Sequence, residues 1–293
     1  MTKIREWLSP PDPSDNYRKA LNLRQADTGL WFLESEQYVK WKTDTASFLW
    51  LHGIPGCGKT ILSSTILQSI LQYCAFDSGN VVAYFYFDFN DAHKQSPELM
   101  IRSLISQLAQ HCVKIPGILE MLFSSCKNRQ QEPSLYALLD ALQEMIRQFP
   151  QAYIVLDALD ECTNRAELMS TLESIIGWQF DGLHLLVTSR KERDIESSLE
   201  CLIEDSNIIC LQSKLVDKDI HRYVHHRLSV DKNLKKWQKN PDLIYEIETA
   251  LMKGAQGMYV YPFINLWSLT LMIKTGFDGL CANWIHWGNV VID

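Results

Sequence analysis

The chain has 293 residues, of which 46% are hydrophobic and 22% charged, and its formal net charge at pH 7 is -7. A chain of this length and composition has room for one large α/β domain and a smaller helical one. Its acidic balance leaves no surplus of positive charge to neutralise phosphates, so we expect no nucleic acid partner.

The eight cysteines form no Cys-x-x-Cys pair and have no regular spacing. The N-terminus carries no signal peptide pattern. We therefore interpret the cysteines as free thiols in a reducing compartment and expect a cytoplasmic protein.

The first part of the chain predicts an arm followed by helices and a strand. Residues 1–27 contain a proline cluster at positions 10, 11 and 13, and are expected to form an N-terminal arm and linker with a helix over 18–27. A second helix is expected from Thr28 through Trp41, because apolar residues recur along it at helical spacing. Thr28 and Gly29 are candidates for covering the base of a nucleotide. Phe48–Leu51 is a short apolar run typical of a buried parallel strand.

The stretch after this strand carries the strongest motif in the chain. Residues 53–60 read Gly-Ile-Pro-Gly-Cys-Gly-Lys-Thr, which matches the phosphate-binding loop pattern of Gly, four residues, Gly-Lys and Ser or Thr. The glycines let backbone N–H groups point at a triphosphate, Lys59 supplies a positive charge, and Thr60 offers a hydroxyl to Mg²⁺. A helix is expected over 60–73, so the phosphates would face its N-terminus. The predicted nucleotide contacts are Gly53, Ile54, Pro55, Gly56, Cys57, Gly58, Lys59, Thr60 and Ile61.

The chain after the phosphate-binding loop alternates between strands and helices. Strands are expected over 80–89, 152–157, 183–190 and 207–211, and helices over 97–111, 116–127, 135–149 and 165–176. Strands separated by helices imply a parallel sheet with helices on both faces. From residue 217 the composition changes to short amphipathic helices, expected over 217–228, 234–237 and 243–252.

Acidic residues follow the expected strand over 152–157. Asp157 would lie at the C-terminal edge of the sheet, where open α/β folds bind ligands, and could hold Mg²⁺ opposite Thr60. Asp160 and Glu161 could polarise the attacking water as general bases. The alternative is an acidic surface loop with no catalytic or metal-binding role. The phosphate-binding loop motif earlier in the chain argues against that alternative.

Arg190 ends the strand expected over 183–190. An arginine at this edge could report whether a γ-phosphate is present, and a solvated loop arginine is the alternative. His221 and His225 share a helix face, but no third ligand has a suitable spacing, so we expect no metal there. Residues 254–273 contain no charged residue, yet Pro262 and the polar residues within them argue against a membrane span.

Four segments in order resemble a known family: FLWLHGIPGCGKT, YFYFDF, YIVLDALDEC and LHLLVTSRKERDIE. They resemble the fungal NACHT-type (STAND) signalling ATPases with a nephrocystin-like N-terminal domain. The resemblance implies that residues 53–60 are the Walker A loop, that Asp157–Glu161 is the Walker B segment and that Arg190 is a sensor. It also implies a five-stranded sheet with the fourth strand between the first and third, followed by a helical lid.

The resemblance predicts a P-loop NTPase domain over residues 28–212, a lid over 213–258 and a divergent tail over 259–293, which we expect to be truncated or a gene-model artefact. It implies a nucleotide switch with ATP and Mg²⁺, slow hydrolysis, self-association in the ATP form, an unknown effector protein and a role in non-self recognition or cell death. The alternatives are an AAA-like remodelling ATPase with rapid turnover and an inert nucleotide-binding fragment.

Overall fold

The computed structural model describes residues 2–77, 79–112, 114, 116–126, 131–211, 214–232, 238, 240–255 and 257–258. The expected tail over 259–293 and the short helix expected over 234–237 lie outside the described residues. The chain forms two compact units. One comprises residues 1–24, 32–52 and 59–209, and the other comprises 25–31, 53–58 and the residues from 210 onward. Residues 53–58 therefore group with the C-terminal helices, which the boundaries expected from the sequence do not anticipate.

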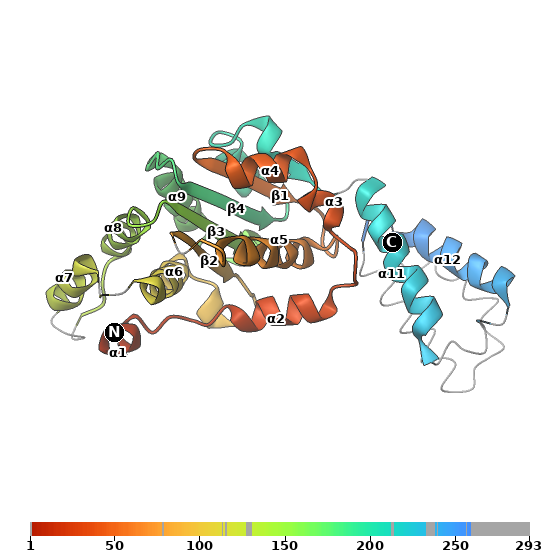
Figure 1. The fold of residues 1–293 in the computed structure, drawn as a ribbon, viewed down its shortest axis with the longest axis horizontal. Coiled ribbons are helices and arrows are strands. Elements are labelled where there is room, and N and C mark those ends of the chain that lie inside the picture. The colour runs from red at the N-terminus through yellow and green to blue at the C-terminus, as the bar shows by residue number, and fades with distance from the viewer. Residues whose placement is uncertain are drawn as a thin grey trace. The chain divides into compact units, whose positions relative to one another are not determined.

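A five-stranded sheet forms the centre of the first unit (Figure 1). Its strands are β1 (Ser47–His52), β2 (Asn80–Tyr86), β3 (Gln151–Asp157), β4 (Leu183–Ser189) and β5 (Ile208–Cys210). The strands lie in the order β2-β3-β4-β1-β5, and the pairs β2–β3, β3–β4 and β1–β4 are parallel. The expected five-stranded P-loop fold is confirmed, including the fourth strand between the first and third.

Twelve helices occur among the described residues. They are α1 (Thr2–Leu8), α2 (Ser14–Leu23), α3 (Leu30–Leu33), α4 (Glu36–Thr43), α5 (Lys59–Cys74), α6 (Pro97–His111), α7 (Gly117–Ser125), α8 (Leu135–Ile146), α9 (Arg165–Gly177), α10 (Arg193–Leu199), α11 (Lys214–Val230) and α12 (Pro241–Ala255). Short 3-10 turns occur at Ala92–Lys94, Leu159–Glu161 and Asp205–Asn207.

Helices cover both faces of the sheet, as expected. Ala83, Ile154 and Leu185 lie side by side across three strands and belong to the main core with the apolar sides of α6, α8 and α9. Because successive side chains of a strand point to opposite faces, Val155 and its neighbours lie on the other face. There α5 contacts β2, β3 and β4, and its Ser64 is hydrogen-bonded to the Tyr86 hydroxyl.

The N-terminal segment differs from the surface arm expected from the sequence. Helix α1 places Ile4, Trp7 and Leu8 in the main core. The buried Arg102 of α6 donates hydrogen bonds to the backbone oxygens of Trp7 and Leu8, at 3.4 Å and 3.2 Å. These contacts fix the last turn of α1, whose carbonyl groups have no partner within the helix. The segment is thus an integral part of the first unit.

In the second unit, α11 and α12 pack against each other along apolar faces, including Ile220, Val224 and Leu251 (Figure 1). The sequence predicts helices over 217–228 and 243–252, and both are longer in the structure. No helix among the described residues meets the length and hydrophobicity needed for a membrane span.

Candidate functional site

Residues 53–58 link the end of β1 to the start of α5, and their conformation depends on glycine. Gly56 and Gly58 have positive φ angles of 74° and 91°, a region that residues with a side chain rarely adopt. The Cys57 N–H donates a hydrogen bond to the Ile54 oxygen at 3.3 Å, which closes the turn. A Cβ atom on Gly53 would lie 2.7 Å from the Cys57 Sγ, so a larger residue here would force the Cys57 side chain to move.

Thr60 and Asp157 come together at the C-terminal edge of the sheet. Asp157 ends β3 and is fully buried. Its Oδ2 accepts a hydrogen bond from the Thr60 hydroxyl at 2.7 Å. Its Oδ1 accepts two more, from Ser63 and Thr188, each at 2.7 Å. Burial raises the pKa of Asp157 above its ordinary value, although the hydroxyl groups and Lys59 act in the opposite direction.

Ser63 and Thr188 were not among the residues predicted from the sequence. Ser63 lies three residues after Thr60 and so on the same side of α5. Thr188 follows Val187, which pairs with Leu156, and this parallel register brings Thr188 beside Asp157. Both positions could have been found from the helix period and from the expected order of the strands.

The residues after Asp157 turn sharply. Ala158 adopts a left-handed conformation with φ of 59°, and its N–H donates to the Thr188 hydroxyl at 3.0 Å. This turn leads directly into the short 3-10 helix Leu159–Glu161, which carries the two predicted general bases. Backbone strain of this kind is concentrated at functional sites.

Asp160 and Glu161 have different partners. Asp160 is bound to Arg190 twice: its Oδ1 accepts the Arg190 backbone N–H at 2.8 Å, and its Oδ2 lies 3.1 Å from the Arg190 Nε. Glu161 accepts the Phe89 N–H at 3.0 Å. Burial, followed by the charges of nearby carboxylates, raises the pKa of Glu161, while the Phe89 N–H lowers it. A carboxylate with a raised pKa suits proton transfer near neutral pH, and Asp160 is already engaged by a cation.

Within the second unit, Asp219 of α11 holds the segment that contains Thr28 and Gly29. The Asp219 Oδ2 accepts the Gly29 N–H at 2.6 Å and the Trp31 Nε1–H at 3.0 Å. Arg222 contacts the Asp219 Oδ1 at 3.2 Å and donates to the Asp27 oxygen at 3.1 Å. Burial raises the pKa of Asp219. Nothing in the sequence pattern indicates this link.

His221 and His225 each lie 3.3 Å from the Glu248 Oε1 of α12. Among the residues that the structure describes, no group of three or more His, Cys, Asp or Glu side chains is arranged to hold a metal ion. The seven cysteines in the described part of the chain form no disulfide bond.

Comparison with known proteins identifies a family whose model matches more than half of this chain. The family described as nephrocystin 3, N-terminal, matches residues 27–190, which include the phosphate-binding loop, Asp157–Glu161 and Arg190. The vegetative incompatibility protein HET-E-1 of Podospora anserina is 23% identical over 241 residues. That alignment covers 80% of this chain and 17% of the relative, so the chain spans only a small part of that protein's length.

Two solved structures are similar to most of this chain. The ORC1 protein of Aeropyrum pernix, determined in complex with DNA, has a TM-score of 0.49 at 15% identity, covering 92% of this chain and 63% of that one. Cdc6p from Pyrobaculum aerophilum has a TM-score of 0.44 at 14% identity, covering 81% of this chain and 64% of that one.

Proposed function

This chain belongs to the nephrocystin 3 N-terminal family, and we propose that it binds ATP with Mg²⁺ and acts as a nucleotide-dependent switch that hydrolyses ATP slowly. One observation carries the proposal. The hydroxyl of Thr60, at the start of α5, and the carboxylate of Asp157, at the end of β3, meet at 2.7 Å although the residues are 97 positions apart. These are the two oxygen donors that the motifs assign to the metal.

The donors around Asp157 fit a hard divalent cation. Mg²⁺ prefers oxygen ligands, and the side chains in contact here are a carboxylate and hydroxyls. Thr60 and Asp157 would hold the ion. When bound, it would neutralise charge on the β- and γ-phosphates.

The other residues have distinct proposed roles. Residues 53–58 and the N-terminus of α5 bind the phosphates through backbone N–H groups, and Lys59 adds a positive charge. Glu161 accepts a proton from the attacking water. Arg190 exchanges its contact with Asp160 for one with the γ-phosphate, since its side chain is half exposed and is held by the Asp160 carboxylate.

The first test replaces Lys59. Lys59→Ala should abolish high-affinity binding of ATP, because the phosphates lose the positive charge that the motif supplies. A titration with a fluorescent ATP analogue, with and without Mg²⁺, measures the effect. Lys40→Ala, which removes an exposed charge from α4, is the matched control and should bind as the wild type does. Equal affinity in the wild type and Lys59→Ala would overturn the assignment of the loop.

A second test addresses Arg190. Arg190→Ala should weaken binding of ATP more than binding of ADP, because only ATP has the γ-phosphate. Hydrogen bonds to charged groups contribute about 1.5–3 kcal/mol, so a loss of ATP preference of roughly tenfold or more is expected. Asp160→Asn removes the ion pair but keeps the arginine, and should retain the preference. Equal losses for both nucleotides would assign Arg190 a purely structural role.

The biological role is proposed from the family and from the relative's name. The relative that is 23% identical over 241 residues is named a vegetative incompatibility protein, which supports a signalling role in non-self recognition or cell death. We propose ATP-dependent self-association and an effector protein as the outputs of the switch, in the cytoplasm. The net charge of -7 is the reason for proposing no nucleic acid partner.

A further inference from the structure

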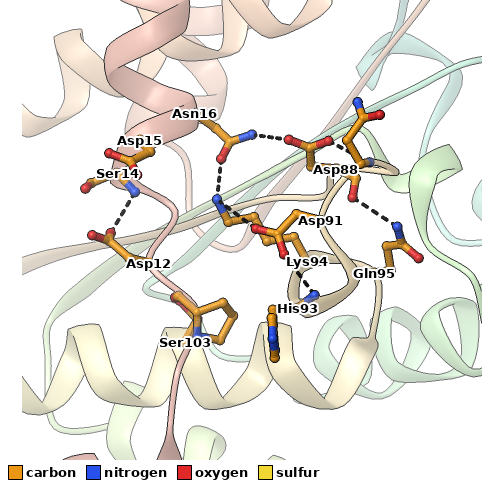
Figure 2. Close-up of polar contacts among 12 residues, drawn as sticks. Asp12, Ser14, Asp15, Asn16, Asp88, Asp91, His93, Lys94, Gln95 and Ser103 are labelled. Atoms are coloured by element: carbon orange, nitrogen blue, oxygen red, sulfur yellow. Dashed lines mark hydrogen bonds and ion pairs between the residues drawn. The ribbon is translucent and has the colours of Figure 1, made fainter.

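The loop that follows β2 folds back on itself (Figure 2). The Asp91 N–H donates to the Asp88 oxygen at 3.0 Å, and the Lys94 N–H donates to the Asp91 oxygen at 2.7 Å. The Asp88 N–H in turn donates to the Lys94 oxygen at 3.1 Å, which closes residues 88–94 into a ring. The Gln95 side chain adds a hydrogen bond of 2.6 Å to the Phe89 oxygen. The loop is thus held by hydrogen bonds among its own residues.

This loop is attached to the Walker B segment on both sides of Glu161. The Phe89 N–H donates to the Glu161 Oε2 at 3.0 Å. The Phe87 N–H donates to the Asp157 oxygen, and the Thr163 N–H donates to the Gln95 oxygen, each at 3.0 Å. Phe89 is therefore the point at which the loop meets the carboxylate, and its position depends on the conformation of the whole ring.

Lys94 is the buried centre of this arrangement. The residue is only 7% exposed, although lysine is almost never buried without partners. Its Nζ donates to the Asn16 Oδ1 of α2 at 2.6 Å and lies 3.7 Å from the Asp91 Oδ2. The Asn16 Nδ2 donates to the Asp88 Oδ2 at 3.0 Å, so that Asn16 bridges Lys94 and Asp88 (Figure 2).

We propose that Lys94 is a positioning residue for Glu161, and that helix α2 acts on the hydrolysis site through the hydrogen bond from Lys94 to Asn16. Lys94 neutralises the carboxylates of the ring and holds it to α2. Without this cation the ring opens, the Phe89 N–H leaves Glu161, and the carboxylate is free to rotate away from the attacking water. The role rests on the proposed function, because it presumes that Glu161 accepts the proton.

The experiment combines hydrogen exchange with kinetics. Lys94→Met keeps the length of the side chain and removes its charge, and Asn16→Ala removes the bridge from the α2 side with a smaller change in volume. Lys19→Met and Asn22→Ala, at exposed positions of α2, are the matched controls. Amide exchange in the nucleotide-free protein is followed in peptides covering 87–91 and 158–163. ADP affinity, kcat and KM are measured on the same variants.

We expect exchange in both peptides to be at least about tenfold faster in Lys94→Met and Asn16→Ala, since those amides lose protection when the ring opens. We expect kcat to fall at least about tenfold, within the contribution of a general base, with KM and ADP affinity unchanged within about twofold. If Lys94→Met does not fold, Asn16→Ala alone tests whether the contact between Lys94 and Asn16 holds the ring. The surface controls should match the wild type in every measurement.

Three results would overturn this inference while leaving the proposed hydrolysis standing. Exchange that stays at the wild-type rate would show that Lys94 does not hold the ring, and faster exchange with unchanged kcat would show that the ring does not position Glu161. A parallel loss of ADP affinity would mean a general disruption. A wild type that never hydrolyses ATP would defeat the proposed hydrolysis itself and the positioning role with it. That result differs from the failure of this inference alone, in which the wild type still hydrolyses ATP.

Discussion

Asp157 is fully buried at the end of β3 and accepts hydrogen bonds from Thr60, Ser63 and Thr188. Three hydroxyl donors satisfy its oxygens, but none of them carries a charge. Burial dominates and raises the pKa of Asp157, so the ionised carboxylate destabilises the nucleotide-free protein. Residues held in this way are commonly retained for function at the expense of stability.

Replacing Asp157 by asparagine should therefore stabilise the nucleotide-free protein. We expect Asp157→Asn in EDTA at pH 7 to raise Tm by roughly 2–4 °C, equivalent to about 1 kcal/mol for a chain of this size. Thermal unfolding by circular dichroism measures the change, with Asp140→Asn at an exposed position of α8 as the control. The same variant should lose the stabilisation that ATP with Mg²⁺ gives the wild type. A lower Tm for Asp157→Asn would contradict the prediction.

The difference between Asp157→Asn and the wild type should also depend on pH. The pKa of Asp157 is higher in the folded state than in the unfolded state, so protonation favours the folded state. As the pH is lowered through the raised pKa, the wild type gains stability relative to Asp157→Asn, and the gap between them narrows. If the stability difference between Asp157→Asn and the wild type increases as the pH is lowered, the ionised carboxylate stabilises the folded protein and the prediction is wrong.

Some residues of the candidate site can be predicted from the sequence, and others are found only in the folded chain. Thr60, Asp157 and Glu161 belong to motifs in which residue type and spacing are specific, and the structure brings Thr60 and Asp157 together. Ser63 and Thr188 escape notice because a serine in a helix and a threonine in a strand are common in any fold. Lys94 and Asn16 are 78 residues apart, and only the folded chain shows that they touch.

Among the helices and strands, those with a clear hydrophobic pattern are the most predictable. Helix α6 and the cores of β3 and β4 lie where the sequence predicts them. The helix expected from Thr28 to Trp41 is instead two helices, because Ser35 caps the second by accepting the Tyr38 N–H. Helix α1 was missed, because seven residues are too few to show a period and a proline cluster follows them.

The burial of α1 predicts a large effect at a position expected to lie in a surface arm. Leu8 is 1% exposed and belongs to the main core, whereas Leu23 at the end of α2 is 68% exposed. Leu8→Ala should destabilise the protein by about 2–5 kcal/mol through lost burial and a cavity, and Leu23→Ala by less than about 0.5 kcal/mol. Urea unfolding followed by tryptophan fluorescence measures both. Equal midpoints for the two variants would mean that α1 does not pack in solution.

The second unit contains three segments that are far apart in sequence. Residues 25–31, the loop 53–58 and the helices from 210 onward form one compact unit, and Asp219 bonds the first of these segments to α11. The phosphate-binding loop thus belongs to the same unit as α11 and α12. If nucleotide binds this loop as proposed, it would contact that unit directly, as the proposed switch requires.

Substitution of Glu161 distinguishes a switch from a turnover enzyme and from an inert fragment. Glu161→Gln keeps the shape of the side chain but removes its basicity, so ATP should bind while hydrolysis falls by about 10²–10⁴-fold. In the wild type, kcat should decrease as the pH falls through the raised pKa of Glu161, because the protonated carboxyl cannot accept a proton. Phosphate release measures both effects, and Glu167→Gln in α9 is a control outside the proposed machinery.

The trapped ATP form of Glu161→Gln should also differ in assembly from the ADP form, since ATP shifts an equilibrium only through its differential affinity for the two states. Light scattering with each nucleotide tests this. Slow wild-type turnover together with ATP-dependent assembly supports the switch. Rapid turnover with identical scattering favours a remodelling ATPase, and binding without turnover or assembly favours an inert fragment. If Asp160→Asn stops hydrolysis and Glu161→Gln does not, the proton acceptor is Asp160, and its contact with Arg190 must break before the reaction.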